Sequence, residues 1–148
     1  MVIYFCGSIA GGRAFIETYA AMVHFLKRNG HTVLTEHIIA PNVWELEQKF
    51  TPKQIYERDM AWLRSADAVI AEISNPSLGV GYEIGAALAA DKQVLALHER
   101  GLRISCMITG NSDPRLQVSD YASPEEWQQL IRAFLDRVDS NRQPSTAG

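Results

Sequence analysis

The sequence has few cysteines, no dense cluster of one charge and no long apolar run. Its 148 residues include only two cysteines, Cys6 and Cys106, which fit no CxxC or Cys/His zinc spacing and are expected to be free thiols in a reducing compartment. The net charge is −3 and the largest basic cluster is the pair Lys27-Arg28, so binding to long nucleic acid is not expected. No apolar run approaches the roughly 20 residues that cross a bilayer, which excludes an integral membrane protein.

Two further absences concern metals and export. The four histidines, at positions 24, 31, 37 and 98, lack the spacing of metal ligands, and no metal site is expected. The first residues, Met1–Cys6, have no basic segment and meet Gly7 too early for a signal peptide. The expected location is therefore the cytoplasm, or the nucleus in a eukaryote.

Short apolar runs alternate along the chain with longer amphipathic segments. Strands are expected at residues 2–5, 32–35, 67–73, 94–97 and 116–118, and helices at residues 15–29, 51–65, 79–90 and 123–138. This alternation predicts an α/β fold, a small doubly wound parallel five-stranded sheet (Rossmann-like or flavodoxin-like) with helices on both faces. Residues 1–138 are expected to form a single domain, the stretch 40–50 a mobile loop, and residues 139–148 a disordered tail.

Ligands of such sheets lie outside the carboxyl ends of the strands, where the strand order reverses. This rule selects residues 5–13, 36–41 and 74–83. In the first segment, Gly7–Arg13, glycines allow the backbone to approach an anion, and its amides at a helix start form a nest for phosphate. The segment lacks the Gly-Lys-Ser/Thr end of a P-loop and the glycine spacing of the dinucleotide fingerprint. Phosphate binding is favoured, with a tight turn as the alternative.

Two carboxyl groups are candidates for chemistry. Glu83 follows Gly79 and Gly81 and is expected in or near the first turn of its helix, where the helix dipole favours an ionised carboxylate and a nucleophile. The alternative is a helix-capping Glu. Asp59 lies on or beside an apolar stripe, where a carboxyl is costly unless it has a partner or a function. Such a pair could divide into a nucleophile and an acid, and a partnered structural Asp is the alternative for Asp59.

These segments together resemble one family. The matching residues are Tyr4–Ile9 with Gly11–Arg13, Leu34–His37, Asp59 with Trp62-Leu63, Pro76–Glu83, and Ser105 followed by Met107-Ile108 and Gly110. They are similar in identity and order to the 2′-deoxynucleoside 5′-phosphate N-hydrolases, a branch of the nucleoside 2-deoxyribosyltransferase superfamily. The resemblance runs from Val2 to Tyr121 and implies a small Rossmann-like fold and a homodimer.

The resemblance implies a role for each matched residue. Glu83 attacks the anomeric carbon, Asp59 protonates the leaving base, Tyr4 orients or tunes Glu83, and His37 lies near the base or sugar. The residues implied to bind the 5′-phosphate are Gly7, Ser8, Ile9, Gly11, Gly12, Arg13, Ser77, Gly79 and Ser105, the last donated to the neighbouring subunit's site. The family often has Arg where this chain has Ala10, and the 40–50 loop, which matches nothing, is expected to influence base preference.

The leading hypothesis is hydrolysis of 2′-deoxynucleoside 5′-monophosphates to free base and 2-deoxyribose 5-phosphate. Two carboxyls suffice for an oxocarbenium-like transition state, so no cofactor is expected. A deoxyribosyltransferase, which passes the sugar to a second base, is the close alternative. A non-catalytic nucleotide-binding module is the alternative from another class, and the pair of Glu83 and Asp59 counts against it because a sensor needs no nucleophile.

Overall fold

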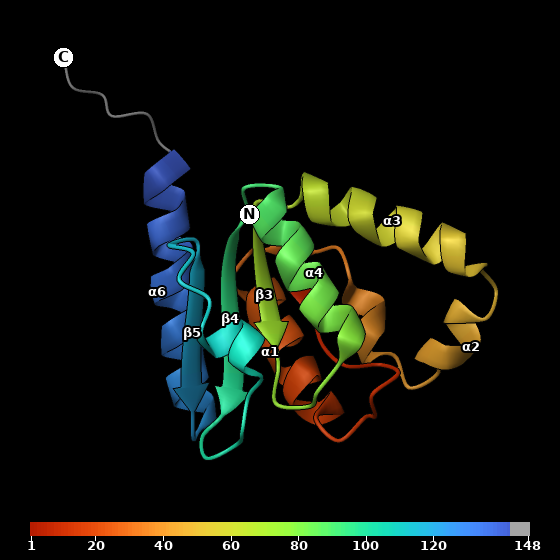
Figure 1. Ribbon diagram of the computed structural model, residues 1–148, viewed down its shortest axis with the longest axis horizontal. Coiled ribbons are helices and arrows are strands. Elements are labelled where there is room, and N and C mark those ends of the chain that lie inside the picture. The colour runs from red at the N-terminus through yellow and green to blue at the C-terminus, as the bar shows by residue number, and fades with distance from the viewer. Residues whose placement is uncertain (143–148) are drawn as a thin grey trace.

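The computed structural model describes residues 1–142, and strands and helices alternate along most of the chain (Figure 1). The elements are β1 (Val2–Cys6), α1 (Ile16–Arg28), β2 (Thr32–Val33), the 3-10 helix η1 (Glu36–Ile39), α2 (Val43–Glu47), α3 (Pro52–Ser65), β3 (Ala68–Glu72), α4 (Leu78–Ala89), β4 (Gln93–Glu99), α5 (Cys106–Thr109), β5 (Leu116–Tyr121) and α6 (Pro124–Arg142).

All five strands are parallel and lie in the order β2-β1-β3-β4-β5. This arrangement confirms the predicted doubly wound sheet and is the flavodoxin-like strand order. The order reverses between β1 and β3, and Cys6 pairs with Ala71 at their carboxyl ends. A ligand site is therefore expected at this edge of the sheet.

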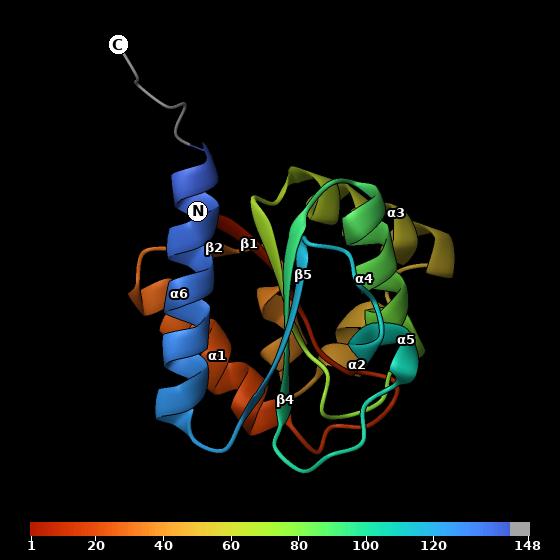
Figure 2. The same ribbon diagram turned by 60° about the vertical axis from the view of Figure 1, so that its left-hand side comes forward.

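Alternate residues of the strands pack into two separate cores. Ile3 and Phe5 of β1 face α1 and α6, whereas Tyr4 and Cys6 face α3 and α4. Figure 2 shows the two helix layers on opposite sides of the sheet. Because side chains alternate across a strand, the Tyr4 hydroxyl belongs to the same face of the sheet as α3 and α4.

The start of α3 has the capping interactions that its sequence predicts. The Thr51 hydroxyl accepts a hydrogen bond from the Gln54 amide at 3.2 Å, and the Gln54 side chain accepts one from the Thr51 amide at 2.9 Å. With Pro52 at the first helical position, this capping box sets where α3 begins and so the turn on which Asp59 lies.

Two predictions about irregular segments were wrong. The stretch 40–50 contains α2, which is anchored by the buried side chain of Val43. Helix α6 continues to Arg142, so residues 139–142 are helical where disorder was predicted. Buried Val138 and the ion pair of Arg142 with Asp67, at 2.7 Å, hold this last part of the helix. The rest of the predicted tail, 143–148, lies outside the described residues.

The second strand is shorter than predicted and ends at Val33. Beyond Val33, the Thr35 side chain replaces the backbone hydrogen bonds between the two strands. Its hydroxyl accepts a hydrogen bond from the Phe5 amide at 2.9 Å and donates one to the Phe5 carbonyl at 2.6 Å. The chain then turns into η1, which carries His37 toward the carboxyl edge of the sheet. The short helix α5 was not predicted.

The described part of the chain has neither a membrane-spanning helix nor a cluster of metal-ligating side chains. No helix within residues 1–142 has the length and apolar character needed to cross a membrane. In the same residues, no group of three or more His, Cys, Asp or Glu side chains is placed to hold a metal ion.

Candidate active site

Glu83 lies on the face of α4 that is turned toward the sheet, beside the end of β1. It accepts a hydrogen bond from the Tyr4 hydroxyl, with 2.6 Å between Tyr4 Oη and Glu83 Oε1, and a second from the Cys6 thiol. Both donors come from alternate positions of the same strand, which explains why they converge on one carboxyl group.

The environment of Glu83 differs from the expected one. Helix α4 begins at Leu78, so Glu83 lies one turn further in than the position where the helix dipole acts most strongly. Burial raises the pKa of Glu83 to about 7, and the Tyr4 hydrogen bond opposes this rise, while the charge of Asp59 adds to it. The prediction of a carboxylate stabilised by the dipole was therefore wrong, because burial dominates.

Burial also keeps the two donors protonated. It raises the pKa of Tyr4 far above its usual range, and the negative charge of Glu83 raises it further. The pKa of Cys6 is raised well above its ordinary value for the same reasons. Tyr4 and Cys6 therefore act as neutral hydrogen-bond donors to Glu83.

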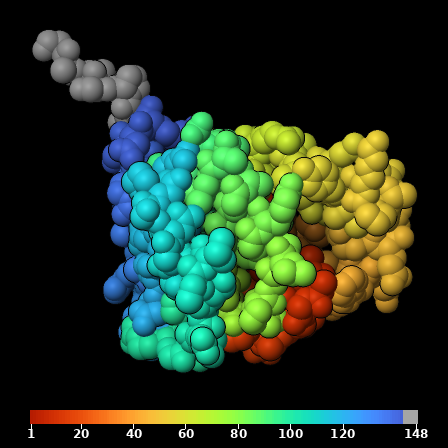
Figure 3. Space-filling view, viewed as in Figure 1, coloured from red at the N-terminus to blue at the C-terminus, as the bar shows by residue number. Residues whose placement is uncertain are grey.

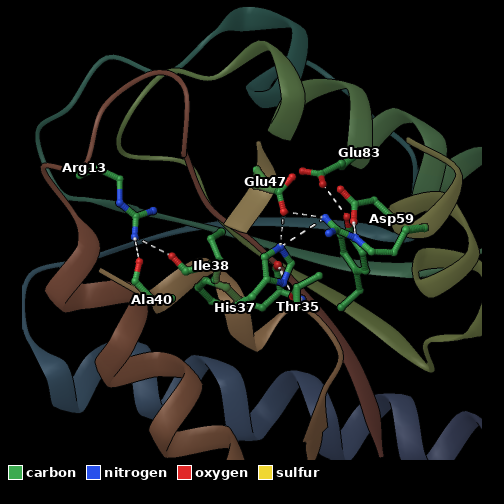
Figure 4. A network of polar contacts seen from close by, with 11 residues as sticks. Arg13, Thr35, His37, Ile38, Ala40, Glu47, Asp59 and Glu83 are labelled. Carbon is green, nitrogen blue, oxygen red and sulfur yellow. Dashed lines mark hydrogen bonds and ion pairs between the residues drawn. The ribbon is translucent and has the colours of Figure 1, made fainter. Parts of the chain in front are cut away.

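Asp59 belongs to a polar network that joins α3, α2 and η1 (Figure 4). Arg58 Nε donates to Asp59 Oδ1 at 2.8 Å, and Arg58 Nη2 donates to Glu47 Oε1 at 2.9 Å. His37 Nε2 lies 3.3 Å from the same Glu47 oxygen. Asp59 thus has the partner that a structural role would need, and it is also close enough for its charge to act on Glu83.

The surface is hollowed between the helices that carry Glu83 and Asp59. Figure 3 shows a depression between α4 in green and α3 and α2 in yellow and orange, with the red first loop at its lower end. The carboxyl groups of Glu83 and Asp59 come from the helices on its two sides.

The glycine-rich loop after β1 packs closely on the loop after β3. The Asn75 side chain donates to the carbonyls of Gly11 and Gly12, at 3.2 and 3.0 Å. A Cβ on Gly11 would lie 2.5 Å from the Pro76 carbonyl oxygen, and Gly12 has a φ of +115°. These two positions therefore require glycine, and the two predicted phosphate-binding segments lie side by side.

The N-terminus of α4 and Ser8 offer hydrogen bonds to an anion. The Ser77 side chain caps α4 by accepting from the Val80 amide at 3.3 Å, which places Gly79 in the first turn. The Ser8 Oγ is buried without a hydrogen-bond partner among the described residues. A buried hydroxyl without a partner is costly, and that cost is relieved when another group accepts a hydrogen bond from it.

Arg13 is used differently from the phosphate-binding prediction. Its Nη2 donates to the Ile38 and Ala40 carbonyls, at 2.7 and 3.4 Å, and so ties the first loop to η1. Figure 4 shows it well apart from Glu83 and Asp59. Its Nη1 is buried without a hydrogen-bond partner within the described residues.

Of the other predicted residues, Ile9 and His37 lie with the rest of the site, whereas Ser105 makes no contact with the two carboxyl groups among the described residues. Ile9 lies in the same loop as Ser8, and His37 joins the Asp59 network through Glu47. Ser105 is exposed and caps α5 by accepting from the Met107 amide at 3.3 Å. None of the recorded contacts of Ser105 within residues 1–142 joins it to Glu83 or Asp59.

Several site residues were missed from the sequence. Arg58, Glu47, Cys6 and Asn75 all contact predicted site residues. Asn75 could have been found, since it lies in the selected 74–83 segment. Glu47 gave no signal because it lies in the stretch expected to be a loop.

Comparisons with known proteins assign the chain to a family. The sequence profile described as nucleoside 2-deoxyribosyltransferase matches residues 3–129. The chain belongs to the nucleoside 2-deoxyribosyltransferase family. Within it, the mouse 5-hydroxymethyl-dUMP N-hydrolase is 46% identical over 140 residues, which are 89% of this chain and 79% of that protein. The putative 2′-deoxynucleoside 5′-phosphate N-hydrolase 1 of Methanosarcina mazei is 40% identical over 133 residues, 90% of this chain and 83% of that protein.

Two solved structures have the same fold. The structure of BlsM has a TM-score of 0.74 with 21% identity and covers 99% of this chain and 97% of its own. The CMP N-glycosidase BcmB of Clostridium botulinum has a TM-score of 0.66 with 20% identity and covers 90% of this chain and 99% of its own. The family and its named members identify the chain as an enzyme of the nucleoside 2-deoxyribosyltransferase family.

The raised pKa of Glu83 has a consequence for stability. Its pKa is about 7 in the folded protein against an ordinary 4.5, so the folded state binds the proton more tightly and loses stability as the pH rises toward 7. Glu83→Gln removes this charge. The variant is expected to be more stable than the wild type by roughly 1–3 kcal/mol above pH 8.

This gain is expected to disappear below about pH 4, where the carboxyl is protonated in both states. Urea unfolding at the two pH values measures the difference, with the exposed Glu57→Gln on α3 as the control for loss of a surface carboxylate. An equal effect of Glu83→Gln at both pH values would contradict a raised pKa.

Proposed function

We propose that the enzyme hydrolyses the N-glycosidic bond of 2′-deoxynucleoside 5′-monophosphates. The observation that carries this proposal is the pairing of Glu83, which Tyr4 holds at 2.6 Å, with Asp59 on the facing helix. The names of the relatives, 2′-deoxynucleoside 5′-phosphate N-hydrolase and 5-hydroxymethyl-dUMP N-hydrolase, support the substrate class.

In the proposed reaction, Glu83 is the nucleophile. A carboxylate oxygen of Glu83 forms a bond to the anomeric carbon while the carbon–nitrogen bond breaks. The electron pair of the broken bond leaves with the base. Asp59 gives its proton to the departing base. It then removes a proton from water, which attacks the same carbon and releases Glu83, as in retaining glycosidases. Tyr4 holds the attacking carboxylate in place, and the reaction assigns no step to a metal or cofactor.

The 5′-phosphate is proposed to bind between the two packed loops. Ser8 offers its buried hydroxyl, Gly7–Gly12 and Gly79 offer backbone amides, and Ser77 lies at the N-terminus of α4. A helix N-terminus next to such a loop favours a phosphate group. Nothing acidic lies at these loop positions, so a dianion is not repelled.

Product chromatography tests the function. Deoxynucleosides and their 5′-monophosphates are incubated separately, with and without a second free base. We expect free base and 2-deoxyribose 5-phosphate from the monophosphates. A new nucleotide that forms faster than the free sugar would instead favour the transferase, and binding without product would favour a nucleotide-binding module.

Ser77→Asp is expected to reverse the preference for phosphate. Aspartate also caps a helix, so α4 is retained, but its charge repels the 5′-phosphate. We expect KM for a monophosphate to rise at least about tenfold while the free deoxynucleoside loses little. Ser77→Asn is the uncharged control that keeps the cap. Equal losses for both substrates would place the phosphate elsewhere.

We also propose a homodimer in which Ser105 reaches the phosphate of the neighbouring subunit's site. Exposed large apolar residues support the interface, since Leu78 and Tyr82 of α4 and Met107 of α5 are 97%, 56% and 82% exposed. Large apolar residues exposed on adjacent helices are typical of a surface that another protein covers. A twofold axis would bring each Ser105 to the partner site.

Mixing two inactive variants tests this shared site. Glu83→Ala and Ser105→Ala homodimers are each expected to be nearly inactive, and they are mixed after reversible dissociation. A heterodimer then holds one complete site, so random pairing should return about a quarter of the wild-type activity. Heterodimers that form without regaining activity would exclude the donation of Ser105.

The proposed location is the cytoplasm. Cys6 and Cys106 are both free cysteines, the first buried and the second exposed. An exposed free thiol suits a reducing compartment.

A further inference from the structure

Tyr19 of α1 lies against the glycine-rich loop after β1 and is fully buried. Its hydroxyl accepts a hydrogen bond from the Ser8 amide, with 3.1 Å between Ser8 N and Tyr19 Oη. A Cβ on Gly7 would lie 2.9, 3.0 and 3.1 Å from three carbon atoms of the Tyr19 ring. One side chain therefore contacts two consecutive residues of the loop, one through its hydroxyl and the other through its ring.

The hydrophobic core holds the Tyr19 ring independently of the loop. The ring packs edge-on against Phe5 of β1, with 6.1 Å between the ring centroids and 62° between the ring planes. Tyr19 also belongs to the core cluster that β1 forms with α1 and α6. Because a close-packed interior restricts a side chain to one position, Tyr19 is a fixed support against which the loop is held.

The Tyr19 hydroxyl is a neutral acceptor for the Ser8 amide. Burial raises the pKa of Tyr19 to about 12, so the phenol keeps its proton at physiological pH and adds no negative charge beside the loop. The Ser8 amide is buried in this hydrogen bond, and a buried amide without an acceptor is costly. If the Tyr19 hydroxyl were removed, the start of the loop would therefore have to shift to find another acceptor.

The loop that Tyr19 supports is one wall of the proposed phosphate site. Its far end is fixed by Asn75, which donates to the Gly11 and Gly12 carbonyls at 3.2 and 3.0 Å. Tyr19 thus fixes the start of the loop, and Asn75 fixes its end. Glycine-rich backbone is flexible unless it is held, and a preorganised set of backbone amides binds an anion more tightly because little ordering is needed on binding.

We propose that Tyr19 is a positioning residue that holds the Gly7–Ser8 backbone in the conformation that binds the 5′-phosphate, and so gives the enzyme its preference for monophosphates over free nucleosides. The inference rests on the proposed function, which places the phosphate between the two loops. Tyr19 is buried and acts through the loop, not on the substrate itself. The carboxyl groups proposed to act on the sugar and base come from α4 and α3, so only the phosphate should depend on Tyr19.

Calorimetry on Tyr19→Phe provides the first test. Phenylalanine keeps the ring and removes only the acceptor of the Ser8 amide. The measurement is made in the Glu83→Gln background, which is expected to bind without turnover, with a 2′-deoxynucleoside 5′-monophosphate and with the matching free deoxynucleoside. We expect Kd to rise about tenfold for the monophosphate, since the Ser8 amide loses its buried partner, and to change less than about twofold for the deoxynucleoside.

Phe25→Leu is the matched control on the same helix. Phe25 is buried near the other end of α1 and packs against Trp127, with 5.5 Å between the ring centroids. This variant loses core packing away from the loop, so both dissociation constants should equal those of the Glu83→Gln parent. In Tyr19→Phe, equal rises for the two ligands, or no rise for the monophosphate, would mean that Tyr19 serves only the fold, and would overturn the inference.

Amide hydrogen exchange gives a readout that needs no ligand. In the free enzyme, the Ser8 amide should exchange about tenfold faster in Tyr19→Phe than in the wild type, because its buried acceptor is gone. The Phe5 amide, which donates to Thr35 Oγ1 at 2.9 Å, is the internal reference and should exchange at the wild-type rate. Unchanged exchange of the Ser8 amide would overturn the inference.

Gly7→Ala disturbs the same contact from the side of the loop, and it decides the question if Tyr19→Phe does not fold. The added methyl group would lie 2.9 Å from the Tyr19 ring, so the loop must shift while the hydroxyl stays in place. We expect the same selective loss of monophosphate affinity, and equal losses for both ligands would overturn the inference. In the double variant, the loss should be smaller than the product of the two single losses, because both changes displace the same loop.

Kinetics separate this inference from the proposed function. With Glu83 intact, Tyr19→Phe should raise KM for the monophosphate about tenfold and change kcat less than about threefold. If the wild type binds monophosphates more tightly than deoxynucleosides but releases no base, the proposed function fails, while the affinities of Tyr19→Phe still decide the role of Tyr19. A wild type that binds both ligands equally well would overturn the inference.

Discussion

Glu83→Gln is expected to lose kcat by roughly 1,000-fold or more while still binding substrate. The amide has the shape of the carboxylate, and its oxygen can still accept the hydrogen bond that Tyr4 donates at 2.6 Å. It has no anionic oxygen to attack the anomeric carbon. The phosphate-binding loops are untouched, so the dissociation constant measured by calorimetry should change by less than about threefold.

Two controls separate this result from simple damage to the site. Tyr4→Phe removes the hydrogen bond but leaves the nucleophile, and we expect it to retain much more activity than Glu83→Gln. Acid-quenched wild-type enzyme should carry a deoxyribose 5-phosphate adduct on the peptide that contains Glu83, detectable by mass spectrometry. If Glu83→Gln kept more than a few per cent of the wild-type rate, the covalent mechanism would be wrong.

Asp59→Asn is expected to have an effect that depends on the leaving base. Only proton donation to the base is lost, and general acid catalysis contributes about 100- to 10,000-fold. Monophosphates whose base leaves easily without a proton should therefore lose little. Monophosphates whose base needs a proton to leave should lose the full contribution of acid catalysis in kcat, about 100- to 10,000-fold. A series of substrates with bases of different acidity measures this dependence as the slope of log kcat against leaving-group pKa.

The slope also separates the two possible roles of Asp59. A structural aspartate, held only as the partner of Arg58, would give equal losses for every base when changed to Asn. Glu57→Asn is the matched control, because it removes an exposed carboxylate from the same helix. A slope that stays as shallow as in the wild type would exclude Asp59 as the acid.

Much of the fold was open to prediction because its signals are local. The capping box at Thr51 and the apolar runs of β1 and β3 depend on residues close in sequence. Parallel strands place their carboxyl ends at one edge, so the sequence also predicted which loops would meet there. The contacts of Asn75 with Gly11 and Gly12 agree with that expectation.

The errors lie where distant contacts override composition. The stretch 40–50 looks like a loop because it is polar, yet buried Val43 anchors a helix there. The end of α6 looks like a tail, yet Arg142 pairs with Asp67 from another part of the chain. Short polar segments carry little intrinsic preference, so a single tertiary contact is enough to decide their conformation.

The sequence alone determined the α/β class, the edge of the sheet that carries the site, and the candidate pair Glu83 and Asp59. Only the tertiary structure decided the surroundings of these two side chains. The pKa of Glu83 is raised to about 7 because the helix is packed against the sheet and excludes water, and Asp59 is tied to Arg58 and Glu47 because α2 folds against α3. Desolvation and charge pairing depend on distances between segments far apart in the chain, and these distances exist only once the chain has folded.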